Sequence, residues 1–167
     1  MRALYAALLV TLVGLPVSAQ KPVQKAAPFK GDIKTLLVFE ERAQQYADRL
    51  VVAADKGENM NTVNYLVTTT SRILHDGQKY LDGLKTTPLS PADAKRLGTI
   101  QQHHTLAQKA FDNLRAELNV KDRNPKRGTV MKLSYQLSDE AMLAQGKTPP
   151  KHPIIKEEEV GPKPPKK

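Results

Sequence analysis

The residues best suited to chemistry in this chain are its histidines, because imidazole can bind a metal or haem iron and can carry protons near neutral pH. Two of them are adjacent on a predicted helix, so their side chains point about 100° apart and are poorly placed to share one ion. Zinc ligands on a helix usually stand three or four residues apart, and no His-Glu-x-x-His or Glu-x-x-His motif surrounds them. The four histidines are His75, His103, His104 and His152.

Metal or haem binding through His103 or His104 is the chemistry that these residues leave open. The chain has no cysteine, which excludes thiolate metal sites and covalent haem attachment through Cys-x-x-Cys-His. A methionine could be the second ligand of a non-covalently bound haem. However, Met60, Met131 and Met142 lie outside the centre of the helices predicted below.

Motifs of catalysis are absent from the sequence. There is no Gly-x-Ser-x-Gly turn to present a nucleophilic serine and no Gly-rich loop to hold a phosphate. Neighbouring carboxylates, such as Glu40 with Glu41, point in different directions on a helix. We therefore expect a protein that is not an enzyme and that carries no cofactor.

Two polar residues interrupt the apolar stripes of the predicted helices: Glu40 on the first and His104 on the third. Buried polar groups need partners. The two could meet with a modest offset between the helices, or His104 could bond Thr70 on the second helix. We hypothesise a polar core of Glu40, Thr70 and His104 that fixes the helix register. The alternative is that Glu40 and His104 reach water at the edges of their stripes.

Three long segments have the apolar spacing of amphipathic helices. The connections between them are short, so neighbouring helices should be antiparallel. Residues 31–120 are therefore predicted to form an all-α, up-down-up bundle of three long helices. The expected end residues are Asp32 and Gly57 for the first helix, Asn59 or Asn61 for the start of the second, and Ser90, Pro91 and Asp93 for the start of the third.

Residues 121–146 are predicted to be a charged loop and a short fourth element packed on the bundle. The apolar spacing of residues 130–137 fits either a strand or a helix. A lone strand would have nothing to pair with in a helical domain. We therefore expect a helix at least over residues 139–145, capped by Ser138 and ended by Gly146.

The two ends of the chain differ from the middle in composition. Arg2, an apolar run from Ala3 to Val17 and small residues up to Ala19 are typical of a cleavable secretory signal. Residues 1–19 are therefore predicted to be a signal peptide, and residues 20–30 a flexible leader. Residues 147–167 hold six of the twelve prolines among lysines and glutamates. This composition predicts a disordered basic tail.

The excess charge indicates the kind of partner. The formal net charge is +9, but residues 31–120 hold 11 basic and 11 acidic side chains, so the positive charge lies on the flanks. An exported protein with few aromatic side chains is not expected to bind nucleic acid. We expect contact with an anionic envelope surface or an acidic protein. The proposed contact residues are Lys147, Lys151, Lys163, Lys166 and Lys167.

Together these features predict an exported, non-enzymatic helical-bundle protein that is periplasmic or secreted. It would act through protein–protein or envelope-surface contact, and it would have no transmembrane span after cleavage. The alternative is a metal- or haem-binding bundle that uses His103 or His104. Long amphipathic helices can also pair between chains, so homo-oligomerisation stays open.

Overall fold

The structure is a computed structural model that describes residues 29–121 and 124–155. Within these residues the chain is all-α and contains four helices and no strand. The helices are α1 (Ile33–Lys56), α2 (Met60–Lys85), α3 (Pro91–Leu118) and the shorter α4 (Arg127–Ala144). The predicted signal peptide and most of the predicted leader lie outside the described residues.

The three long helices begin where the sequence predicts. Asp32 accepts a hydrogen bond from the backbone N–H of Thr35, Asn59 does the same for Thr62, and Ser90 for Asp93. Such side chains satisfy backbone donors that have no partner within the helix. Gly57 ends α1 with φ of 66°, a left-handed conformation that costs glycine little. These cap predictions are confirmed.

The fourth helix is longer than predicted and begins elsewhere. It starts at Arg127, so residues 130–137 are helical and Ser138 lies in its interior. The prediction that Ser138 caps this helix is wrong. Ser138 is buried, and its hydroxyl bonds Oδ1 of Asp48 on α1 at 2.7 Å. A bond between helices thus takes the place of the expected cap. Gly146, with φ of 77°, directly follows the last turn of the helix, in agreement with the predicted end.

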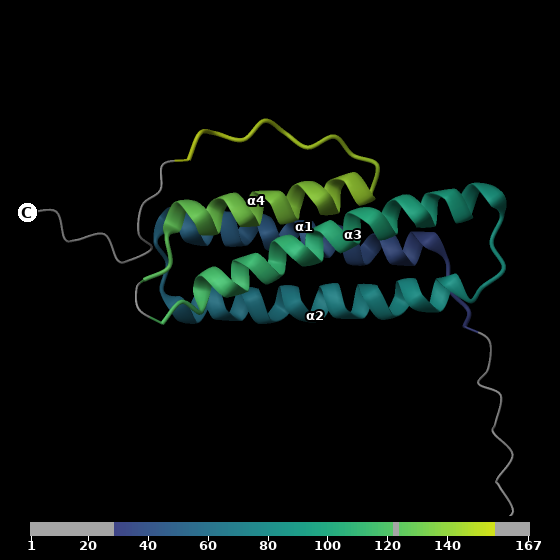
Figure 1. The fold of residues 1–167 in the computed structure, drawn as a ribbon, viewed down its shortest axis with the longest axis horizontal. Helices are drawn as coiled ribbons and strands as arrows, with labels where there is room; N and C mark the ends of the chain where they lie inside the picture. Colours follow the sequence, from purple (N-terminus) through teal and green to yellow (C-terminus); the bar gives the residue numbers. More distant parts are fainter. Residues whose placement is uncertain (1–28, 122–123, 156–167) are drawn as a thin grey trace, which may run out of the picture.

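The helices run alternately in opposite directions, so the architecture is an up-down-up-down bundle (Figure 1). Because α4 is longer than predicted, it forms a fourth side of the bundle instead of covering part of a three-helix bundle. It packs along both α1 and α3, and α1 packs along α2. In contrast, α2 and α3 make much less contact with each other, although a short loop joins them. The bundle therefore has one loosely packed seam, between α2 and α3.

The core consists of two apolar clusters separated by a polar layer. One cluster contains Ile33 and Leu36 of α1 together with the C-terminal part of α2 and the N-terminal part of α3. The larger one begins at Ala43 and Ala107 and fills the other end of the bundle. Glu40 of α1 and His104 of α3 lie in sequence between the two sets. No described helix is apolar enough over a sufficient length to cross a membrane.

The packed part of the chain extends beyond both ends predicted for it. Phe29, in the predicted leader, stacks edge-on against Tyr80 of α2, with ring centroids 5.0 Å apart. After α4, residues 147–155 form an extended segment, called the strap here, that returns along α4 (Figure 1). Ile155 of the strap packs against the larger core cluster. The boundary predicted at residue 147 therefore does not mark the end of the packed chain. Residues 156–167 lie outside the described residues.

Candidate functional site

Glu40 and His104 meet in the centre of the bundle. Oε1 of Glu40 lies 2.7 Å from Nδ1 of His104, and both side chains are almost completely buried. The other polar atoms of the pair, Oε2 of Glu40 and Nε2 of His104, have no hydrogen-bond partner among the described residues. Thr70 is also buried, but its hydroxyl donates to the carbonyl of Leu66 one turn earlier in α2. The structure therefore brings together Glu40 and His104 and leaves Thr70 separate.

Gly77 provides the room for this pair. A Cβ atom at position 77 would lie 3.2 Å from Cε1 of His104 and 3.3 Å from Cβ of Phe39. Gly77 is buried in the middle of α2, where glycine costs about 1 kcal/mol relative to alanine in helix propensity. The absence of a side chain lets α2 pass close to the imidazole and to α1.

Two further histidine–carboxylate pairs hold α3 and the strap to α4. Nδ1 of His103 lies 2.8 Å from Oε2 of Glu140, and both side chains are partly buried. Nε2 of His152 lies 2.7 Å from Oδ1 of Asp139. The His152 ring also stacks on Tyr135, with centroids 3.9 Å apart. Asp139 and Glu140 are neighbours in sequence, yet each bonds a different element.

These histidine–carboxylate pairs give only limited support for a metal site. Among residues 29–121 and 124–155, no group of three or more His, Cys, Asp or Glu side chains is placed to hold a metal ion. His103 and His104 both direct Nδ1 to a carboxylate, an arrangement that orients metal-binding histidines in other proteins. The second nitrogen of His104 is buried. Of these two adjacent histidines, His103 is therefore the more accessible to a ligand.

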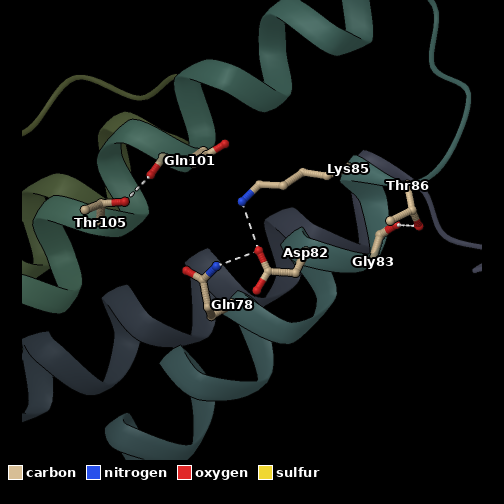
Figure 2. Close-up of polar contacts among 7 residues, drawn as sticks. All are labelled: Gln78, Asp82, Gly83, Lys85, Thr86, Gln101 and Thr105. Atoms are coloured by element: carbon tan, nitrogen blue, oxygen red, sulfur yellow. Dashed lines mark hydrogen bonds and ion pairs between the residues drawn. The ribbon is translucent and has the colours of Figure 1, made fainter.

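The polar residues near the C-terminal end of α2 make bonds within their own helix. Gln78 and Lys85 both donate to Oδ1 of Asp82, at 2.9 Å each (Figure 2). The bonds from Lys85, and next from Gln78, hold the pKa of Asp82 below its usual value. On α3, Thr105 bonds the carbonyl of Gln101. None of the bonds drawn in Figure 2 joins α2 to α3.

At the other end of the seam the two helices form a groove of about 540 Å³, called the α2–α3 groove here. Its walls carry two arginines, one from each helix, and no carboxylate. Arg72 and Arg115 are exposed, and neither makes an ion pair with another described residue. The lining residues are Asn64, Val67, Thr68, Ser71, Arg72 and His75 of α2, and Arg115 and Asn119 of α3.

This groove was not predicted from the sequence. Its α2 residues repeat at helical spacing and contain no acidic side chain, which is a weak signal. The same spacing describes an ordinary solvated helix face, and the sequence does not say which polar face lies beside α3. Of the lysines proposed as partner contacts, Lys147 and Lys151 are exposed on the strap. Lys163, Lys166 and Lys167 lie outside the described residues.

Comparison with known proteins yields no relative: no protein-family model, no curated protein and no solved structure matches this chain.

Proposed function

We propose that the protein is an exported, non-enzymatic helical bundle, periplasmic or secreted, that works by contact with an anionic partner. The observation that carries this proposal is the α2–α3 groove. Arg72 and Arg115 line this hollow, and no carboxylate does. Arginine retains its charge at any physiological pH and matches the geometry of carboxylate and phosphate groups. A groove of this composition attracts anions and repels cations.

The concave shape of the groove favours a partner that can enter it, rather than a partner with a flat surface. A bilayer presents its head groups in a plane, whereas a side chain or chain segment of an acidic protein can reach between two helices. The lysines of the strap and of the residues after it add a second, less specific attraction. Such exposed charges act over about 8–10 Å at physiological ionic strength and weaken as salt is added.

The test is association with the native envelope fraction at low and high salt. We expect the double variant Arg72→Gln, Arg115→Gln to lose at least tenfold in association at low salt. The matched control Lys79→Gln, Lys109→Gln removes the same charge from exposed positions of the same helices, outside the groove. This control should change association less than twofold. Equal losses in both variants, or no loss in either, would contradict the proposal.

A truncated chain separates the groove from the lysines that follow it. A cut after Gly146 would also remove the strap, which packs on α4, so the cut belongs after Ile155. This shorter chain keeps Lys147 and Lys151 and should retain most of the association. If truncation abolishes association and the arginine substitutions have no effect, the C-terminal residues are the contact and the groove is not.

A second candidate function is metal or haem binding through His103 or His104. The observation that favours it is the bond between Nδ1 of His103 and Glu140, which would leave Nε2 of His103 as the ligand atom. Nε2 of His104 is buried, so His104 is the weaker choice. A visible absorption spectrum and a metal analysis of the purified protein test it. A haem band or a stoichiometric metal that His103→Ala removes would support this candidate, and protein without either would contradict it.

A further inference from the structure

We propose that the α2–α3 groove binds an extended acidic segment of a partner protein. This inference rests on the proposed function and names the chemistry of the partner. It draws on three properties of the groove: its length, the position of its two arginines, and the hydrogen-bonding groups between them.

The length suits a short peptide. The groove follows α2 from Asn64 to His75, and at about 1.5 Å per residue this distance along the helix is about 16 Å. An extended peptide rises about 3.3 Å per residue. About five residues of a partner chain would therefore lie along the groove.

The arginines are placed on opposite walls. Arg72 belongs to α2 and Arg115 to α3, so a chain between the helices passes both guanidinium groups. Each can form two parallel hydrogen bonds with one carboxylate. Neither arginine makes an ion pair with another described residue, and no carboxylate lines the groove. A ligand therefore does not have to displace a described acid. Two acidic side chains on one peptide would satisfy both arginines.

The uncharged residues that line the groove favour a peptide over other polyanions as the ligand. Asn64 and Asn119 contribute amide groups, and Thr68 and Ser71 contribute hydroxyls. Amides and hydroxyls both donate and accept hydrogen bonds. A peptide backbone offers N–H donors and C=O acceptors, so it can use both properties. A phosphate group presents acceptors only, so it would use the donors of these residues but not their acceptors.

The experiment is fluorescence anisotropy of a labelled penta-glutamate peptide titrated with the full-length mature chain at low salt. Penta-glutamine is the neutral control. We expect saturable binding of penta-glutamate and at least a tenfold weaker affinity in Arg72→Gln, Arg115→Gln. In the control Lys79→Gln, Lys109→Gln the affinity should change less than twofold. All four positions are exposed, and circular dichroism checks that each variant is folded.

Competition with inorganic polyphosphate and with phosphatidylglycerol vesicles separates the failure of this inference from that of the proposed function. If either competitor binds more tightly than the peptide and depends on Arg72 and Arg115, the groove is an anion site but the peptide inference is overturned. If both double variants weaken binding equally, the attraction is unspecific and both proposals fail.

One rival occupant is part of this chain. Residues 157–159 are three consecutive glutamates. A chain ending at Ile155 should bind penta-glutamate with the affinity of the longer chain. If its affinity is at least tenfold higher, the chain's own acidic residues occupy the groove, and the inference of a separate partner is overturned.

Discussion

Substitutions of Glu40 and His104, which form the buried pair, are predicted to change the free energy of unfolding in a strongly non-additive way. Replacing His104 by leucine leaves the Glu40 carboxyl group buried without its partner, and replacing Glu40 by methionine does the same to the imidazole. Removing one member of a buried ion pair costs about 3–5 kcal/mol. Each single variant should therefore lose about this much free energy of unfolding.

The double variant should recover all of that loss. Besides the bond that they share, the two side chains bury two polar atoms without a described partner. Each such atom costs about 1–3 kcal/mol. Replacing a buried ion pair by apolar side chains of similar volume is often neutral or stabilising by about 1–4 kcal/mol. The double variant should thus be at least as stable as the natural protein, against a summed loss of about 6–10 kcal/mol for independent sites.

Urea unfolding of the four proteins, followed by circular dichroism, measures this coupling. The reasoning is refuted if each single substitution costs less than about 1 kcal/mol and the two losses add, because this result would mean that water reaches both groups. The same variants test the register hypothesis. A double variant that is more stable, monomeric and still uniquely folded by NMR would show that the polar layer is not needed to fix the register.

Three further predictions concern the glycine contact, the strap and a helix cap. Gly77→Ala should destabilise the protein, because its Cβ would press on the buried imidazole; Gly98→Ala, with nothing within 4 Å, should gain up to about 1 kcal/mol. The prediction is contradicted if thermal unfolding shows that both substitutions change the stability of the protein in the same direction. His152→Ala removes the bond to Asp139 and should speed tryptic cleavage within the strap; an unchanged rate means that other contacts hold it. Hydrogen bonds from Thr35 lower the pKa of Asp32 from 3.8, so its stabilisation is complete above that value and is lost as pH falls through the lower folded pKa. Asp32→Asn keeps a good cap and should remove this part of the acid dependence of the urea midpoint, whereas equal slopes for both proteins would contradict the assignment.

The sequence predicted those features that depend on neighbouring residues. Caps such as Asp32 and Ser90 bond a backbone N–H three residues ahead, so their pattern is visible in one short stretch. The contact between Glu40 and His104 was one of three arrangements that the stripes allowed. It is selected by the folded bundle, in which α4 packs along both α1 and α3 and the two side chains meet in the core.

Features that depend on packing between elements distant in sequence could not be predicted from short stretches of the sequence. Ser138 resembles a cap in sequence, but its hydroxyl bonds Asp48, 90 residues away. The composition of the strap favours disorder, yet Tyr135 and Asp139 of α4 provide partners for His152. The α2–α3 groove was not predicted because its polar residues differ from a solvated face only in which helix lies beside them.

The most direct test of the central claim is to map where an acidic peptide contacts the protein. In an NMR titration of the ¹⁵N-labelled chain with penta-glutamate, we expect the largest amide shift changes in residues 64–75 and 115–119, with the strap unaffected. The same titration of the Arg72→Gln, Arg115→Gln variant should give almost no change. Shift changes that spread over all exposed lysines, or that concentrate in the strap and the residues after it, would contradict the assignment of the α2–α3 groove as the site of contact.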